Sequence, residues 1–379
     1  MLNEQEKVRT QEDPGDAEDD VQMFCYGPLA GSISTLGKEV YSNTVKMYCS
    51  TLTQYEEQKK PDQNLEKDVV PLPIGREQTR VSQPIIWRNV IAIAVLHFLA
   101  VYSFVTRYSE GTLWIWIFTI AYGLTAGFGV TAGMHRLWAH RSYSAKTPLR
   151  IVLACLYCMM GQTHFYKWLR DHRTHHKYSE TAADPHDATR GFFFSHIGWL
   201  MMKRHPAVKE YGSKIDMSDI LADPVITFFD KYYEIIMIWL AFVFPTLLPV
   251  YLWGETWYVS FHATVIRYVF SLHATFAVNS FAHMWGNRPY NRRVKPTENA
   301  VVSFFAHGEG WHNYHHSFPW DYKAAELGSS WLNTTTGFIE LMERVGLAYD
   351  LKTPSKELVE RTAQKKGDGT DSLWGHRRH

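Results

Sequence analysis

The sequence has 379 residues and a formal net charge of +1, which disfavours a general polyanion-binding role such as non-specific binding to nucleic acid. Aromatic residues make up 15% of it, with 14 Trp, a high share for a soluble enzyme and typical of chains that contact membrane interfaces. The mean hydropathy of −0.25 requires a large polar part beside any membrane part.

Residues 1–80 are rich in Glu, Gln, Asp, Lys and Ser and show no sustained apolar periodicity. Such a composition cannot bury enough apolar surface to offset the entropy of ordering the chain. We therefore predict a cytosolic N-terminal tail over 1–80 that is largely disordered. A second cytosolic tail is predicted over 355–379.

Four apolar segments approach or reach the length of a membrane span, which is roughly 20 residues. They cover about residues 89–105, 113–131, 233–253 and 257–276. Basic residues cluster before the first segment and after the second and fourth, whereas the short links inside each pair carry at most one. The positive-inside rule then predicts two hairpins with both termini in the cytosol. The expected fold is an all-α integral membrane protein of four transmembrane helices with a cytosolic helical cap.

Histidines recur in three boxes, all of them predicted to lie on the cytosolic side of the membrane. The first box is GMHRLWAH, directly after the second apolar segment, and the other two are DHRTHH and HGEGWHNYHH. One more histidine follows the fourth segment in NSFAHMW. The full set is His135, His140, His172, His175, His176, His283, His312, His315 and His316.

The spacing of these histidines favours metal binding. In H-x-x-H-H the imidazoles occupy positions i, i+3 and i+4, which share one face of a helix. Neutral imidazole is a common ligand of Fe, Cu and Zn, and nine exceed what one metal can use, so a dinuclear centre is the simplest interpretation. His135 and His140 stand five residues apart, about 140° around a straight helix. They meet at one metal only if the helix breaks there.

Several motifs together resemble those of the membrane acyl-CoA desaturases, and most of all the animal stearoyl-CoA (Δ9-type) desaturases with their insect branch. They are HRLWAH, HRTHHK, GEGWHNYHHSFPWDYK, NSFAHMWGNRPY and ETAADPHDATRGFFFSHIGWL. The resemblance covers about residues 84–354, a single desaturase domain. It implies an endoplasmic-reticulum enzyme with two Fe²⁺ ions that uses O2 to insert a cis double bond at Δ9 into a saturated long-chain acyl-CoA. Electrons are expected from NAD(P)H through cytochrome b5 and its reductase.

The resemblance also assigns roles to individual residues. It makes the nine histidines iron ligands, with Asn279 reaching one iron through a water. Basic side chains are expected at the CoA phosphates, an aromatic ring near the tunnel entrance, and small residues at the methyl end of the acyl chain. These assignments fall on Arg170, Lys203 and Arg204 for CoA, with Asp171 in the same substrate region, on Trp168 at the entrance, and on Thr119 and Gly123 at the methyl end.

Two positions depart from the pattern of close relatives. Thr163 stands where they carry Asn, and Phe276 stands where they carry Trp. Both positions belong to the substrate path. The chain-length preference and the position of the double bond therefore stay open, as does the oligomeric state.

Carboxylates among the boxes are candidates to hold the second ring nitrogen of the ligating histidines, an interaction that fixes the tautomer of a metal ligand. Ordinary surface carboxylates are an equally weighted alternative. The candidates are Asp171, Glu180, Asp184, Asp187 and Glu309.

Two other functions are compatible with these patterns. A hydroxylase or a sphingolipid-type desaturase would use the same irons, although the WDYK and NRPY contexts favour the acyl-CoA branch. A non-catalytic membrane protein with structural zinc would not need all boxes intact, and all are intact. The predicted topology also leaves the Asn333 sequon in the cytosol, where we expect it to stay unglycosylated.

Overall fold

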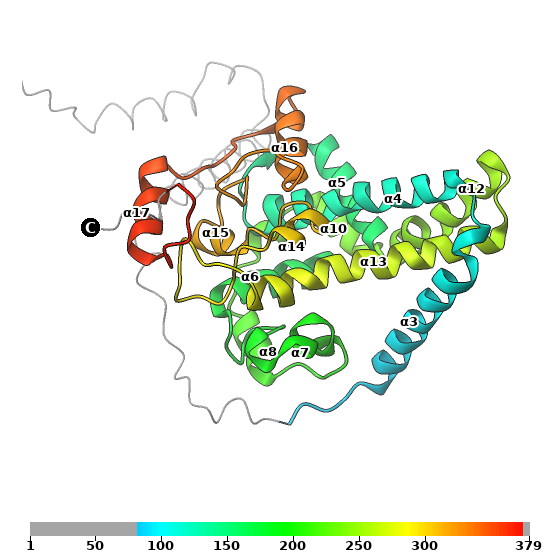
Figure 1. Cartoon of the computed structure of the whole chain (residues 1–379), viewed down its shortest axis with the longest axis horizontal. Coiled ribbons are helices and arrows are strands. Elements are labelled where there is room, and N and C mark those ends of the chain that lie inside the picture. Colours follow the sequence, from blue (N-terminus) through cyan, green and yellow to red (C-terminus); the bar gives the residue numbers. More distant parts are fainter. Residues whose placement is uncertain (1–81, 374–379) are drawn as a thin grey trace, which may run out of the picture. The chain divides into compact units, whose positions relative to one another are not determined.

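Helices dominate residues 82–373, the part of the chain that the computed structural model describes (Figure 1). The predicted tail over 1–80 lies outside the described residues. The longer helices are α3 (Trp87–Arg107), α4 (Leu113–Phe128), α5 (Thr147–Met160), α6 (Phe165–Tyr178), α12 (Phe244–Trp253), α13 (Trp257–Met284), α16 (Thr334–Arg344) and α17 (Lys356–Lys366). The shorter ones are α7 (Phe192–His196), α8 (Pro206–Gly212), α9 (Ser218–Leu221), α10 (Pro224–Lys231), α11 (Tyr233–Ile238), α14 (Ala300–Phe305) and α15 (His312–Ser317).

Tighter and wider helical turns complete the chain. The segments η3 (Gly129–Ala139) and η6 (Trp239–Val243) are π-helical, and η2 (Tyr108–Glu110), η4 (Ala188–Arg190) and η5 (Gly198–Leu200) are 3₁₀ turns. Two short antiparallel strands, β1 (Ser144–Ala145) and β2 (Ala348–Tyr349), join the region after η3 to the end of α16.

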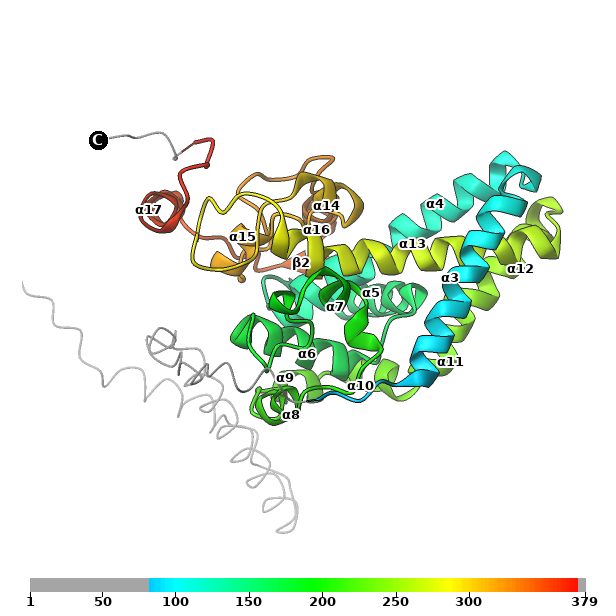
Figure 2. The same ribbon diagram turned by 60° about the horizontal axis from the view of Figure 1, so that its bottom comes forward.

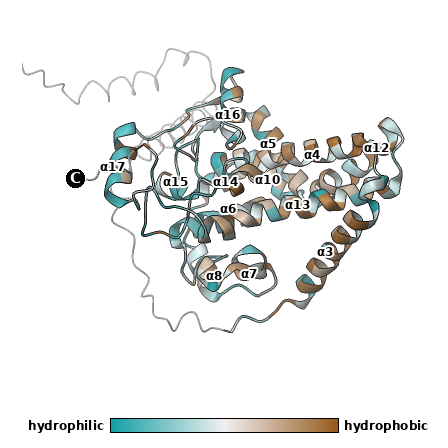
Figure 3. Cartoon of the chain, viewed as in Figure 1, coloured by the Kyte–Doolittle hydropathy of each residue, from teal (hydrophilic) through white to brown (hydrophobic). Residues whose placement is uncertain are grey.

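Three helices within residues 82–373 are long and apolar enough to cross a membrane. They run over Trp87–Glu110, Leu113–Ala139 and Tyr233–Trp253, where three of the four spans are expected. Figure 3 shows the apolar colouring that α3, α4 and α12 share, in contrast to the hydrophilic α17. The third expected span is interrupted by η6, a π-helical turn that precedes Pro245 and Pro249.

Helix α13, where the fourth span is expected, is not among these three membrane candidates. It is 28 residues long and carries His262, Arg267 and His273 along its length, which lowers its apolar character. It contacts α3, α4 and α12 and runs beside α4 in both views (Figures 1 and 2). The fourth span therefore stays a prediction.

The two expected hairpin turns lie next to each other. Thr112 begins α4 as its N-cap, and its hydroxyl donates to Glu255 Oε2 at 2.7 Å. Glu255 follows Gly254, which ends α12 with φ of 75°. Thr256 is then the N-cap of α13, since its side chain accepts from the Val259 amide. Both turns therefore lie at the same end of the helix group.

The opposite end of the helix group carries the cap. Its hydrophobic core lies where α5 crosses η3. Gly129 allows this crossing, because a Cβ there would come within 2.1 Å of the Tyr157 backbone nitrogen. Part of the predicted C-terminal tail is also packed on the cap. Val359 and Ala363 of α17 are buried against Tyr290, Tyr314 and Phe318.

Candidate metal centre and substrate cavities

The first histidine box lies at the end of η3, which continues directly from α4. The backbone N–H of His140 donates to the His135 carbonyl oxygen at 3.1 Å, the i→i+5 bond of a π-helix. This wider turn stacks residues that are five apart, and the two imidazole centroids lie 4.8 Å from each other. The break that the sequence requires for His135 and His140 to share a site is thus present as a π-helix.

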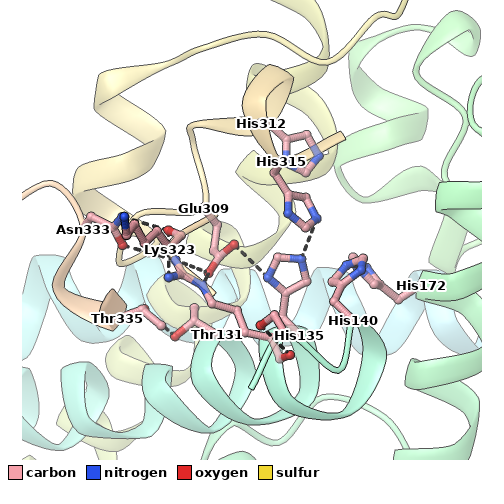
Figure 4. A network of polar contacts seen from close by, with 12 residues as sticks. Thr131, His135, His140, His172, Glu309, His312, His315, Lys323, Asn333 and Thr335 are labelled. Carbon is pink, nitrogen blue, oxygen red and sulfur yellow. Dashed lines mark hydrogen bonds and ion pairs between the residues drawn. The ribbon is translucent and has the colours of Figure 1, made fainter. Parts of the chain in front are cut away.

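The nine histidines come together in two adjacent clusters. The five-histidine cluster is His135, His140, His172, His176 and His315. The four-histidine cluster is His175, His283, His312 and His316. Within each cluster, all candidate ligand atoms lie within 4.8 Å of one another. Four segments contribute, η3, α6, α13 and α15, and both α6 and α15 supply histidines to both clusters; Figure 4 shows His135 facing His315.

Three of the five candidate carboxylates hold histidines of these clusters. Each accepts from an Nδ1 nitrogen: Glu309 from His135 at 2.8 Å, Asp184 from His175 at 2.9 Å, and Glu180 from His283 at 2.9 Å. The other two have different partners. Asp171 pairs with Arg204, and Asp187 accepts from the Thr189 amide and hydroxyl.

A buried polar network anchors Glu309 (Figure 4). Arg136, only 1% exposed, donates to Glu309, to the Tyr322 and Lys323 carbonyl oxygens and to Asn333. Burial alone would raise the pKa of the Glu309 carboxyl, but Arg136 and His135 together lower it to about 2. Glu309 is therefore ionised at neutral pH, which favours a proton on His135 Nδ1 and a free lone pair on Nε2.

The donor atoms fit a divalent metal in each cluster. Nε2 atoms face one another across short distances, as in His135–His315 at 2.9 Å and His283–His312 at 3.0 Å. The carboxylates hold the proton of His135 and of His283 on Nδ1, which leaves each Nε2 with its lone pair. The Nε2–Nε2 contacts therefore bring nitrogen lone pairs together, an arrangement that a cation stabilises. Burial, and then the neighbouring imidazoles, lowers the pKa of the cluster histidines well below its ordinary value. This holds for His140, His172, His176, His312, His315 and His316.

A cavity of about 410 Å³, which we call the proximal cavity, opens beside the five-histidine cluster between α3, α6 and α13. Its lining includes five residues that the sequence assigned to the site: Thr163, Trp168, Asp171, Phe276 and Asn279. His172 of the five-histidine cluster also reaches its wall, and the Trp168 ring stacks on that imidazole at 5.1 Å.

A second cavity, the distal cavity, has a volume of about 380 Å³ and lies between α4 and α13. Thr119 and Gly123 line it, as expected for the end of a tunnel between the second and fourth segments. Thr275 lines both cavities. Its hydroxyl accepts from Gln162 at 2.9 Å, and the Gln162 carbonyl accepts from the Trp168 indole at 3.0 Å. This hydrogen-bonded series marks the place where the two cavities adjoin.

Two of the three basic residues assigned to CoA, Arg170 and Arg204, lie beside Asp171 rather than on the wall of the proximal cavity. Arg204 makes a two-pronged contact with Asp171, and Arg170 Nη2 lies 3.5 Å from the same carboxylate. Lys203 is exposed. The cation on the cavity wall itself is Lys167, one helical turn before Asp171 on α6.

Comparison with known proteins agrees with this geometry. The model of the fatty acid desaturase family matches residues 111–327. An acyl-CoA Delta-9 desaturase of Acheta domesticus is 50% identical over 315 residues, covering 83% of this chain and 87% of that protein. Stearoyl-CoA desaturase 5 of Bos taurus is 52% identical, with 76% and 86% covered. An acyl-CoA Delta(11) desaturase of Spodoptera littoralis is 48% identical, with 77% and 86% covered.

The chain belongs to the fatty acid desaturase family. This confirms the resemblance read from the histidine boxes. Membership implies the use of iron and O2, which agrees with two clusters of imidazoles and no thiolate ligand among them.

Sequence reasoning missed several residues of the desaturase cavities. Gln162, Lys167, Trp199 and Thr275 line the proximal cavity without belonging to any box. Lys167 could have been found, because it shares a helix face with Asp171 at i, i+4. Thr275 carries no local signal, since its partner Gln162 is 113 residues away in the chain.

The Asn333 sequon has a structural role that the sequence did not reveal. Asn333 is 1% exposed and begins α16 as its N-cap. Its Oδ1 accepts from Arg136 at 3.2 Å, and its Nδ2 donates to the Lys323 carbonyl at 2.9 Å. Burial alone is therefore expected to keep Asn333 unglycosylated, so its glycosylation state is a poor test of the membrane topology.

Replacing Asp184 by Asn is expected to weaken metal retention at the four-histidine cluster by about 10- to 100-fold, the usual effect of losing an outer carboxylate. The substitution keeps the shape of the side chain but removes the charge that holds the His175 Nδ1 proton. The measurement is metal content after equilibration against graded chelator concentrations. Asp187→Asn is the matched control, because within residues 82–373 the Asp187 carboxylate accepts from the Thr189 amide and hydroxyl and not from a cluster histidine. Equal retention in the two variants would contradict the role of Asp184.

Proposed function

We propose that the chain is an acyl-CoA desaturase of the endoplasmic reticulum that inserts a cis double bond at Δ9 into saturated long-chain acyl-CoA. The observation that carries this proposal is the position of two histidine clusters beside two adjoining cavities within a group of apolar helices. The similarity to an acyl-CoA Delta-9 desaturase and to a stearoyl-CoA desaturase supports the substrate and the bond position.

Two irons are proposed, one for each cluster. The five-histidine cluster would hold one, and the four-histidine cluster would hold the other together with Asn279, whose position on α13 is one turn before His283. Bound iron supplies the activation of O2 that removal of hydrogen from an unactivated C–H bond requires. Glu309, Asp184 and Glu180 keep the Nδ1 protons of their histidines in place and so keep each Nε2 directed at its cluster.

The acyl chain is proposed to occupy both cavities, with its carboxyl end toward the cap. Trp168 and Thr163 would contact the proximal part, and Thr119 and Gly123 the methyl end. The CoA phosphates would contact Arg170, Lys203 and Arg204, since guanidinium and ammonium groups bind phosphate well. Lys167 on the proximal wall adds a fourth cation. The thioester end is then fixed by charge, so the bond position is counted from that end.

The proposed electron source is cytochrome b5, supplied by its reductase from NAD(P)H. Two electrons and two protons from outside, with two hydrogens from the acyl chain, reduce O2 to two waters. The proposed topology has four spans, α13 being the fourth, and both termini in the cytosol. The contact between Thr112 and Glu255 supports it, because it brings the two hairpin turns to one side.

The deciding experiment is expression of the full chain in a cell that lacks its own acyl-CoA desaturase, followed by analysis of the acyl chains. The expected result is a single cis-Δ9 product. A Δ11 product would match the bond position named for the Spodoptera littoralis relative. It would contradict the proposed Δ9 position and leave the desaturase proposal intact. A hydroxylated product or no product would contradict the desaturase proposal.

Fully active enzyme is expected to contain two irons per chain, because the two clusters have separate ligand sets. Zn²⁺ binds nitrogen sites more tightly than Fe²⁺ does, so overproduced protein loaded with zinc should be inactive until iron replaces it. Metal analysis of the same preparation before and after iron loading, paired with activity, provides the measurement. One metal per chain at full activity would contradict the dinuclear centre.

A further inference from the structure

Three histidines outside both metal clusters form a continuous hydrogen-bonded series across three helices. His97 Nε2 of α3 lies 2.9 Å from His273 Nε2 of α13. His273 Nδ1 lies 2.8 Å from His196 Nε2 of α7. The series ends at the Ser280 hydroxyl, 2.8 Å from His196 Nδ1, and at the Ile93 carbonyl, 2.7 Å from His97 Nδ1. We call His97, His273 and His196 the three-histidine series.

The hydrogen-bond partners at the two ends indicate which ring nitrogen of each histidine carries the proton. The Ile93 carbonyl can only accept, so His97 Nδ1 carries a proton and His97 Nε2 accepts from His273. His273 Nδ1 then accepts from His196, whose Nδ1 can accept from the Ser280 hydroxyl. Ser280 also lies 3.0 Å from the Phe276 carbonyl, its other possible acceptor.

Every contact along the three-histidine series is satisfied with all three imidazoles neutral. In agreement, burial, and then the neighbouring His273, lowers the pKa of His196 to about 4. Both nitrogens of each ring are in use, and within residues 82–373 none of the three belongs to a candidate metal group. The series is therefore a hydrogen-bonded link and not a third metal site.

The link joins two walls of the proximal cavity. His97 lines this cavity from α3, next to Ile93 and Leu96. Phe276 and Asn279 line it from α13, and the Phe276 ring lies 5.9 Å from that of His196. His273, which belongs to the series, and Ser280, which bonds it, thus flank Phe276 and Asn279 along α13.

Helix α3 is held beside this cavity at its start by Asn89, whose Nδ2 donates to the Leu200 carbonyl at 2.8 Å, and along its length by packing against α13. Only 6% of the most apolar 18-residue stretch of α3 is buried within the described residues, so most of its surface faces outward. A second histidine of α13, His262, bonds Ser103 of α3 at 2.6 Å. Neither residue lines the proximal cavity. His97–His273 is therefore the histidine contact between α3 and α13 that borders the cavity.

We propose that His273 is a positioning residue that sets the distance between α3 and α13 and thereby the fit of the acyl chain in the proximal cavity. It acts through His97 on one side and through His196 and Phe276 on the other. The inference rests on the proposed function, because it assumes that an acyl chain occupies this cavity. Loss of the link would loosen the cavity wall and weaken substrate binding while leaving both metal clusters complete.

The test compares His273→Leu with the wild type in full-length protein carrying both irons. Leu is apolar and of similar size but cannot bond either neighbour. Interhelical hydrogen bonds in membranes are modest, so KM for acyl-CoA is expected to rise by about 3- to 20-fold. The effect on kcat should be smaller than the effect on KM, and the metal content should not change.

His262→Leu is the matched control, because it removes a histidine bond between the same two helices away from the cavity. Its KM is expected to match the wild type. His273→Asn should recover most of the wild-type KM, since an amide offers one donor and one acceptor to the two neighbours. If His273→Leu does not accumulate in the membrane, His97→Leu breaks one of the two bonds and provides the same comparison.

Three outcomes would overturn the proposal. One is an unchanged KM in folded, metal-loaded His273→Leu protein, and another is an equal rise in the KM of His262→Leu, which would indicate general loosening of α3. Loss of metal from His273→Leu would also overturn it by assigning the effect to the metal centre. Failure of the proposed function is distinguishable, because the wild type itself would then form no unsaturated product.

Discussion

Replacing His312 by Ala is expected to abolish desaturation while the protein remains in the membrane. His312 Nε2 lies 3.0 Å from His283 and 3.2 Å from His316, so its removal leaves the four-histidine cluster with three imidazoles. Losing an outer-shell partner already costs about 10- to 100-fold, and losing a ligand should exceed that range. The measurement is unsaturated product per amount of membrane-bound protein, together with iron content.

The same loss is expected for Ala substitutions of His172, His175 and His316, which lie in the two clusters. His262→Ala provides the control, because His262 bonds Ser103 far from either cluster. Its iron content and turnover should stay near those of the wild type. Normal activity in His312→Ala would mean that the four-histidine cluster does not take part in the reaction.

Replacing Gly123 by Phe is expected to shift the preference toward shorter acyl-CoAs and to leave the double bond at the same distance from the thioester. A Cβ at this position would meet Arg267 Cγ at 3.4 Å and Ser271 Oγ at 3.7 Å, so a small side chain is tolerated there. An aromatic ring must extend further and would fill part of the distal cavity of about 380 Å³. Overpacking costs about 1–3 kcal/mol, equivalent to roughly 5- to 150-fold in the ratio between long and short substrates.

The measurement for Gly123→Phe is a competition between acyl-CoAs of different lengths. Ile117→Phe is the control, since Ile117 belongs to the same helix α4, is 47% exposed and does not line the distal cavity. An unchanged length profile in active Gly123→Phe protein would remove Gly123 from the tunnel wall. A moved double bond would instead point to a shift at the CoA end of the substrate.

The buried Arg267, which lines the distal cavity, links the helices around it. Its guanidinium donates to the Met159 carbonyl at 3.2 Å and to the Ala241 carbonyl, which lies in the π-helical turn η6. A π-helical turn disrupts the regular i→i+4 pattern and can free carbonyls for such partners. The Tyr122 hydroxyl uses the adjacent Leu240 carbonyl in the same way. Helices α4, α5 and α13 are thus tied to one turn of the third span.

The amino-acid sequence by itself identified the desaturase family and singled out the nine histidines that the structure brings into two clusters. Metal ligands at i, i+3 and i+4 share a helix face whatever the tertiary fold, so the boxes of α6 and α15 could be recognised locally. Apolar length likewise predicted segments that correspond to three helices long and apolar enough to cross a membrane. The fourth span was less certain for a physical reason, because α13 mixes apolar residues with His262, Arg267 and His273.

Only the tertiary structure decided how the nine histidines divide into two clusters. The division depends on the π-helical turn that brings His135 to His140 and on contacts such as His135–His315, which are 180 residues apart in the chain. The tertiary structure also showed that Glu180, Asp184 and Glu309, and not Asp171 or Asp187, contact a ring nitrogen of a cluster histidine. Local sequence cannot tell which carboxylate faces a ring nitrogen. The cavities and the three-histidine series arise where α3 and α7 meet α13. Such contacts are set by long-range packing, which leaves no periodic signal in a single sequence.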